Sequence, residues 1–192
     1  MKWLAALGKG KVCYFPGPLT LARQKELVSN YKSILSDLGI PFIMIPEFVF
    51  CGSQARDAGY EEEFLKVKER NVELLRRHGV TKIITNDPHS AYTFGHEYSI
   101  EAEHVLVTLQ EHRRKLEARF SGKADYIESG VLRNKLGLTK EGRAVVQAAG
   151  FSLGKQAPWP ILPRMMISRG IFPSSASSCW IGVWSLCLLK CW

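Results

Sequence analysis

The stretch VTKIITNDPHSAYTF, from Val80 to Phe94, decides the fold because it joins a strand-like run to a turn and a helix start. Lys82 to Thr85 is rich in β-branched residues and follows Gly79, which predicts a short buried strand. Asp87 is a good helix N-cap and Pro88 a good first helical residue, so a helix should follow. Open α/β sheets bind ligands where a parallel strand ends and a helix begins. We therefore expect the functional site at this turn.

The segments before this stretch show the same alternation of strand and helix. Strands are expected at Lys11–Phe15 and Pro41–Ile45, and helices run from about Thr20 to Gly39 and from Glu61 to Gly79. Residues 46–59 form a connecting loop. The order strand, helix, strand, helix, strand, helix predicts an α/β fold, a parallel sheet of Rossmann-like βαβ units.

After the central stretch the pattern continues and then weakens. Further helix is expected at Ala91–Tyr98 and from Glu103 to about Arg119. A second unit begins with a strand at Lys123–Ile127, and its helix is expected at Lys140–Ala149. We predict a first domain over residues 1–122, an incomplete second repeat over 123–154, and an irregular C-terminal tail over 155–192.

The composition of the tail differs from that of the rest of the chain. Pro158, Pro160 and Pro163 work against any regular element, and the segment has no acidic residue. Four of the five tryptophans and three of the five cysteines follow Pro158, which is unlike the preceding α/β pattern. We interpret the tail as a segment produced by an altered reading frame or as a partly disordered end, and we favour both over an apolar anchor.

Charge and cysteine content limit the possible function classes. The net charge is +8, but residues 142–192 carry five basic and no acidic residues, which leaves 21 basic against 18 acidic residues, or +3, for residues 1–141. A nucleic-acid-binding face is therefore not supported. The five cysteines do not form a disulfide framework, and both terminal apolar runs are too short for a signal peptide or a transmembrane segment. We expect a cytoplasmic location.

Three side chains near the predicted site have competing interpretations. Asp87 is explained more economically as a helix N-cap than as a metal ligand. Cys51 lies in a glycine-containing loop with no histidine placed to activate it, so an idle buried thiol is favoured over a nucleophile. Asn71 is expected to bond the backbone near the site loop. His96 and His104 are eight residues apart, which is not the spacing of a close helical pair of metal ligands.

Several motifs together indicate a family. They are YFPG at Tyr14–Gly17, CGS at Cys51–Ser53 followed by Gly59, NVELLRRHGVTKIIT at Asn71–Thr85, and NDPHSAYTF with HEY at Asn86–Tyr98. In order and spacing they resemble the cysteine-rich CCG domain family, found in the heterodisulfide reductase catalytic subunit, the glycolate oxidase iron–sulfur subunit and lactate-utilisation proteins. The resemblance covers about residues 10–151, and a weaker copy begins near Ala124.

The resemblance implies a cofactor and a set of ligand positions. Members of the family hold a four-iron, four-sulfur (4Fe–4S) cluster with five cysteines. The corresponding positions in this chain are Pro18, Phe50, Cys51, Asp87 and Ser90. Cys51 is then the one thiolate metal ligand that remains, and Asp87 and Ser90 are the other candidate cofactor-binding residues. Because such clusters are held by several thiolates together, we expect the fold to be retained with the cluster lost or its site altered.

In the second copy, the opening cysteine would fall on Gly130. The resemblance implies a subunit or fragment of a heterodisulfide-reductase-like iron–sulfur oxidoreductase, an electron-transfer scaffold that packs against other subunits of an electron-transfer complex. The alternatives are a cofactor-free binding or structural module, and a truncated product without independent activity.

Overall fold

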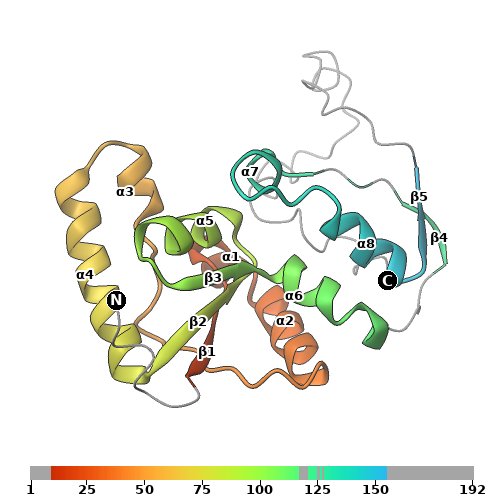
Figure 1. The fold of residues 1–192 in the computed structure, drawn as a ribbon, viewed down its shortest axis with the longest axis horizontal. Helices are drawn as coiled ribbons and strands as arrows, with labels where there is room; N and C mark the ends of the chain where they lie inside the picture. Colours follow the sequence, from red (N-terminus) through yellow and green to blue (C-terminus); the bar gives the residue numbers. More distant parts are fainter. Residues whose placement is uncertain (1–9, 117–120, 125, 127, 155–192) are drawn as a thin grey trace. The chain divides into compact units, whose positions relative to one another are not determined.

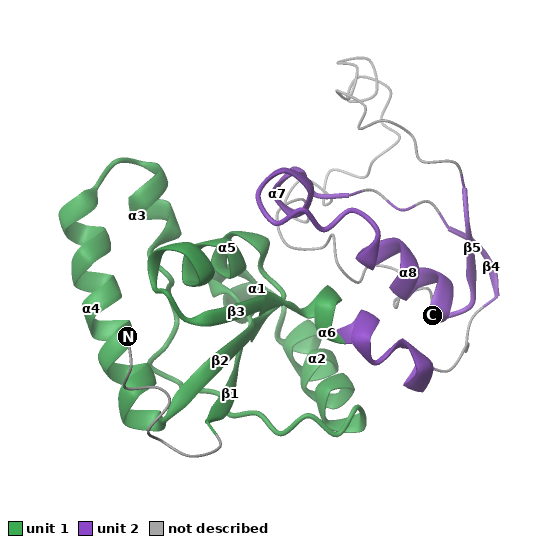
Figure 2. Ribbon diagram, viewed as in Figure 1, with its two compact units in different colours: residues 1–108 green, residues 109–192 purple. Residues whose placement is uncertain are grey.

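The computed structural model describes residues 10–116, 121–124, 126 and 128–154. The chain divides into two compact units, residues 1–108 and residues 109–192 (Figure 1 and Figure 2). The predicted tail over residues 155–192 lies outside the described residues, and the predicted repeat boundaries stay predictions.

A three-stranded parallel sheet forms the centre of unit 1. Its strands are β1 (Lys11–Phe15), β2 (Val80–Thr85) and β3 (Glu101–His104), in the spatial order β1-β2-β3. Phe15 pairs with Thr85, and Thr85 pairs with His104, so the three carboxyl ends lie level. The predicted α/β class with a parallel sheet is confirmed.

The first helical segment differs from its prediction. Two helices, α1 (Pro18–Arg23) and α2 (Lys25–Asp37), replace the single expected helix, because Gln24 leaves the helical region with φ −131° and ψ 55°. Amphipathic periodicity continued across the break and hid it.

The predicted strand at Pro41–Ile45 was wrong for most of its length. Ile43 alone bridges β1, through Tyr14 N to Ile43 O and Ile43 N to Val12 O, both at 2.9 Å. Proline donates no backbone hydrogen bond, so Pro41 and Pro46 limit the pairing around Ile43.

The next helices follow the expected end signals. The helix α4 spans Glu61–His78, with three glutamates in its first turn and Gly79 as a left-handed C-cap at φ 69°. Negative charge at the start and a left-handed glycine at the end both stabilise a helix. The preceding segment is not only a loop, because it contains the short helix α3 (Ser53–Asp57).

The segment after β2 begins as predicted and then departs from the prediction. The helix α5 spans Pro88–Glu97. A helix was expected from Glu103, but residues 101–104 form β3, and the helix α6 (Val105–Glu111) and a 3-10 turn, η2 (Arg113–Lys115), come after it. Lys82 bonds Glu101 at 3.0 Å and Glu103 at 2.8 Å, and this pairing across the strands favours extended backbone at two residues that otherwise suit a helix.

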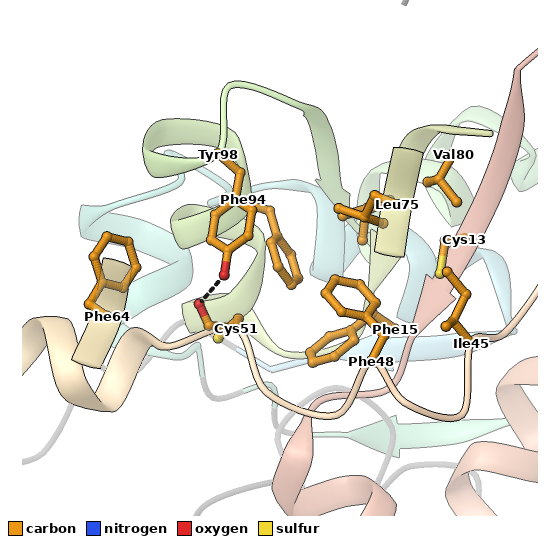
Figure 3. Close-up of a cluster of buried hydrophobic side chains, with 11 residues drawn as sticks. Cys13, Phe15, Ile45, Phe48, Cys51, Phe64, Leu75, Val80, Phe94 and Tyr98 are labelled. Carbon is orange, nitrogen blue, oxygen red and sulfur yellow. Dashed lines mark hydrogen bonds between the residues drawn. The ribbon is translucent and has the colours of Figure 1, made fainter. Parts of the chain in front are cut away.

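The core on one face of the sheet is built from aromatic rings (Figure 3). Phe94 on α5 is fully buried, and its ring centroid lies 5.1 Å from Phe15, 5.3 Å from Phe48 and 5.0 Å from Tyr98. Edge contacts of this kind add to the stability that burial of the rings supplies. This cluster fixes α5 and the 48–51 segment against the sheet.

Unit 2 contains a smaller parallel pair. Its elements are β4 (Gly122–Ala124), α7 (Gly130–Asn134), α8 (Glu141–Ala148) and β5 (Phe151–Leu153), and β4 pairs with β5 in parallel. The predicted strand and helix are present in shortened form, whereas α7 and β5 were not predicted. No helix among the described residues is long and apolar enough to cross a membrane.

Candidate functional site

The site begins where β2 ends and α5 starts. The Thr85 Oγ1 atom accepts a bond of 3.1 Å from the Asp87 backbone N–H. Asp87 is the N-cap of α5, with extended backbone, and its Oδ2 atom accepts from Ser90 N at 3.1 Å. The predicted N-cap role of Asp87 is confirmed.

A second loop touches this turn at Gly17. Gly17 precedes α1 with φ 75°, and a Cβ atom built on it would lie 2.7 Å from the Asp87 Cβ atom. Only glycine allows both this backbone conformation and this close approach. The glycine of the YFPG motif therefore brings the start of α1, at Pro18, beside Asp87, although Pro18 offers no side-chain donor or ligand atom.

The structure brings Cys51, Ser90 and Asp87 together. Cys51 is fully buried, and its Sγ atom lies 3.2 Å from Ser90 Oγ and 3.3 Å from Ser53 Oγ. The Ser90 hydroxyl also bonds the Asp87 carboxylate. Cys51 and Ser90 are far apart in sequence, so the predicted proximity of these three positions is a property of the fold.

Ser90 connects the Cys51 sulfur with the Asp87 carboxylate. Its hydroxyl lies within hydrogen-bond distance of both groups and can donate to either one. Cys51 Sγ in turn donates to Ser53 Oγ.

The backbone that carries Cys51 is held from two helices. Asn71 on α4 donates from Nδ2 to Phe50 O at 2.6 Å, which confirms the backbone bond predicted for it, and to Tyr98 OH at 2.9 Å. Tyr98 in turn donates to Cys51 O at 2.9 Å (Figure 3). Burial raises the pKa of Tyr98, so its hydroxyl remains a donor. Phe50 itself is 57% exposed.

A second set of buried hydrogen bonds, centred on Asn86, holds the turn before Asp87. The Asn86 side chain accepts from Tyr14 OH at 3.0 Å and donates to Thr20 Oγ1 at 3.1 Å. The backbone carbonyl of Asn86 accepts from His104 Nε2 at 3.1 Å. One asparagine thus connects β1, α1 and β3 immediately before Asp87.

The ionisation of His104 is determined by its two bonds and its burial. Its Nε2 atom must carry the hydrogen because a carbonyl only accepts, and its Nδ1 atom accepts from Leu106 N–H at 3.3 Å. Burial lowers the pKa of His104 to about 4. Histidine spacing tests metal ligation alone and missed this structural role. A helix was expected from Glu103, so the sequence analysis did not place His104 at the end of a strand.

The residues at the five cluster positions do not fit a 4Fe–4S cluster. Cys51 supplies one sulfur, whereas several thiolates together hold such a cluster. The Ser53 and Ser90 hydroxyls both bond the Cys51 sulfur, and the Ser90 hydroxyl also bonds the Asp87 carboxylate. Within residues 10–154, so far as the structure describes them, no group of three or more His, Cys, Asp or Glu side chains could hold a metal ion.

Comparison with known proteins agrees with the motif order. Residues 12–95 match the family described as the CCG cysteine-rich domain. The matched region holds two cysteines, Cys13 and Cys51. Cys13 lies on β1 at no cluster position, and burial raises its pKa to about 12. No curated protein and no solved structure matches the chain.

Proposed function

We propose, from the premise that residues 12–95 are a CCG cysteine-rich domain, that the chain is a subunit of a heterodisulfide-reductase-like iron–sulfur oxidoreductase. In this proposal the domain is a scaffold without a cluster of its own. It packs against other subunits of an electron-transfer complex, and those subunits carry the redox centres.

The observation that carries the proposal is the hydrogen-bonded group of Cys51, Ser90 and Asp87. A cluster at this place would need thiolates that the chain lacks. The carboxylate of Asp87 at the start of α5 supplies a negative charge where the positive end of the helix dipole favours one. The site is therefore stable as protein alone, and the domain keeps its shape without a cofactor.

The scaffold role also agrees with the way the loops are fixed. The Asn71 and Tyr98 bonds hold the Phe50–Cys51 backbone, and Asn86 holds the turn before Asp87. Buried polar side chains that satisfy one another rigidify a fold. A rigid surface suits a subunit that positions its neighbours.

Iron and labile sulfide measured on anaerobically purified protein test the proposal. We expect no iron and no visible absorbance, together with a cooperative unfolding transition. A positive control combines Pro18→Cys, Phe50→Cys, Asp87→Cys and Ser90→Cys, which restores the thiol set that the resemblance implies. Uptake of about four iron atoms by the control and none by the natural chain would support a cluster-free scaffold. About four iron atoms in the natural chain would contradict it.

The partner side of the proposal needs a separate measurement. Affinity purification of the chain from its native cells should recover iron–sulfur subunits in fixed proportion. Recovery of the chain alone, still folded, would favour the cofactor-free module instead.

A further inference from the structure

A short segment follows Cys51 in the chain and contacts its sulfur through Ser53. We define the flap as residues 52–59, which consist of α3 and its flanking residues. Gly52 and Gly59 stand at its two ends with φ 80° and φ 81°. Both values lie in the left-handed region that glycine adopts at little cost. The flap is thus a small rigid helix between two residues that can absorb backbone rotation, as hinge residues do.

The outer side of the flap contacts α5 through an exposed ion pair and through an exposed contact between a carboxylate and a histidine. Arg56 Nε lies 3.2 Å from Glu97 Oε1, and Asp57 Oδ2 lies 3.8 Å from His89 Nδ1. The Arg56 side chain is 43% exposed, and both members of the Asp57 pair are about half exposed. Exposed pairs of this kind contribute little to stability and are screened by salt.

The inner side of the flap has few buried attachments. Ser53 is buried and bonds Cys51 Sγ at 3.3 Å, and Ala55 packs partly buried against the hydrophobic core. Gly52 is also buried, and a Cβ atom built on it would lie 2.9 Å from the Phe64 ring. The remaining flap side chains, those of Gln54, Arg56, Asp57 and Ala58, are exposed. Segments with few buried apolar contacts open at a lower free energy than the whole fold.

We infer that the flap opens as a unit about Gly52 and Gly59 while the sheet, α4 and α5 stay folded. Opening separates Ser53 from Cys51 and gives solvent or a partner subunit access to the Cys51 thiol, the Ser90 hydroxyl and the Asp87 carboxylate. Two ion pairs of Arg56, with Glu97 on α5 and with Glu61 on α4, hold the closed position, and Glu97→Gln removes the first of them. This inference rests on the proposed function, because it takes Cys51 as a free thiol rather than a cluster ligand.

Alkylation of the full-length native chain by N-ethylmaleimide tests the inference, with peptide mass spectrometry to separate the cysteines. Cys13 is an internal reference, because it lies on the central sheet and is reached only when the sheet unfolds. We expect Cys51 to react faster than Cys13. In Glu97→Gln the ratio of the two rates should rise about threefold, the size expected for loss of one exposed pair. Higher salt should raise the same ratio.

Glu73→Gln is the matched control. Glu73 pairs with Arg76 and Arg77 on α4, outside the flap, so its removal should leave the ratio unchanged. Equal rates for Cys51 and Cys13, or the same ratio in Glu97→Gln and Glu73→Gln, would overturn the inference. If Glu97→Gln merely destabilises the fold, the alkylation rates of both cysteines rise and their ratio stays constant. That result would also contradict local opening of the flap. Iron in the same preparation would instead contradict the proposed function, so the two failures appear in different measurements.

Discussion

Both units contain a strand followed by two helices and a parallel partner of that strand, and they differ in the elements that come next. In unit 1, β1, α1 and α2 precede Ile43, which bridges back to β1 in parallel. In unit 2, β4, α7 and α8 precede β5, which pairs with β4 in parallel. Unit 1 then adds α4, β2, α5 and β3, whereas the described part of unit 2 ends at Gly154.

The difference shows what the added strands contribute. The turn at Asn86 and Asp87 comes directly after β2, and His104 ends β3, so the whole candidate site depends on elements that the described part of unit 2 does not have. Unit 1 also holds more of the buried hydrophobic residues than the described part of unit 2 does. Three buried hydrophobic residues of the described chain, Leu109, Ala124 and Leu132, belong to unit 2, and all the others belong to unit 1. A small core gives a unit little stability of its own.

The largest expected effect comes from truncating the two cores. Phe94→Ala removes a fully buried ring that contacts three others and should lower the free energy of unfolding of unit 1 by about 3–5 kcal/mol. Leu132→Ala should cost about 2 kcal/mol, and only in unit 2. Native-state hydrogen exchange, read separately on peptides from each unit, checks both. Loss of protection in β1 and β2 caused by Leu132→Ala would show that the units are not independent.

The second-largest expected effect is a dependence of the stability of unit 1 on pH. The pKa of His104 is about 4 in the folded chain and near 6.5 when unfolded, so the unfolded state binds more protons between these values. The stability contributed by neutral His104 is therefore complete above about pH 6.5 and is lost as the pH falls toward 4. Urea unfolding should give a free energy about 2 kcal/mol lower at pH 5 than at pH 7 from this group.

His104→Gln separates this contribution from the titration of the carboxylates. The variant should lose the part of the pH dependence that His104 causes, whereas His96→Gln, at an exposed position, should retain it. An unchanged pH profile in His104→Gln would rule out His104 as the titrating group.

A third, smaller effect tests the connection between β1 and the turn. Tyr14→Phe removes the hydroxyl that donates to Asn86 Oδ1 and leaves that buried acceptor without this donor. The expected loss is about 1–2 kcal/mol in urea unfolding. Tyr92→Phe, on the partly buried side of α5, is a control for removal of a hydroxyl elsewhere. Equal losses of unfolding free energy in the two variants would mean that the bond from Tyr14 to Asn86 stabilises the fold no more than the Tyr92 hydroxyl does.

The smallest effect compares one N-cap from each unit. Asp87→Ala should cost about 1 kcal/mol, because Asp87 caps α5 and also bonds the Ser90 hydroxyl. Ser129→Ala should cost about 0.5 kcal/mol, since Ser129 caps only the five-residue α7 with a 3.3 Å bond. Helix-specific hydrogen exchange distinguishes the two. A larger loss at Ser129 than at Asp87 would contradict the contrast between the units.

Local signals predicted the parts of the fold that depend on neighbouring residues. The β-branched run before Asn86, the N-cap at Asp87 and the glycine that ends α4 all form as expected. The failures have different causes. Pairing with Lys82 favours the strand at Glu101 and Glu103, and the backbone angles of Gln24 divide a periodic helical segment.

The candidate site was predictable only as a set of positions. Motif spacing singled out Cys51, Asp87 and Ser90, but spacing does not reveal that their side chains bond one another. Nor did any pattern show that Asn86 connects Tyr14, Thr20 and His104, because these residues come from different elements.

The sequence by itself determined most of the order of strands and helices, the turn at the end of β2 and the presence of a single cysteine, Cys51, among the five positions that the family resemblance implies. Those properties depend on residue type and on near neighbours. The tertiary structure decided that Cys51 is buried, that Ser90 and Asp87 complete its hydrogen bonds, and that His104 stays neutral. Burial and long-range hydrogen bonds depend on which segments the fold brings together, and that is set by the packing of the whole sheet and its helices.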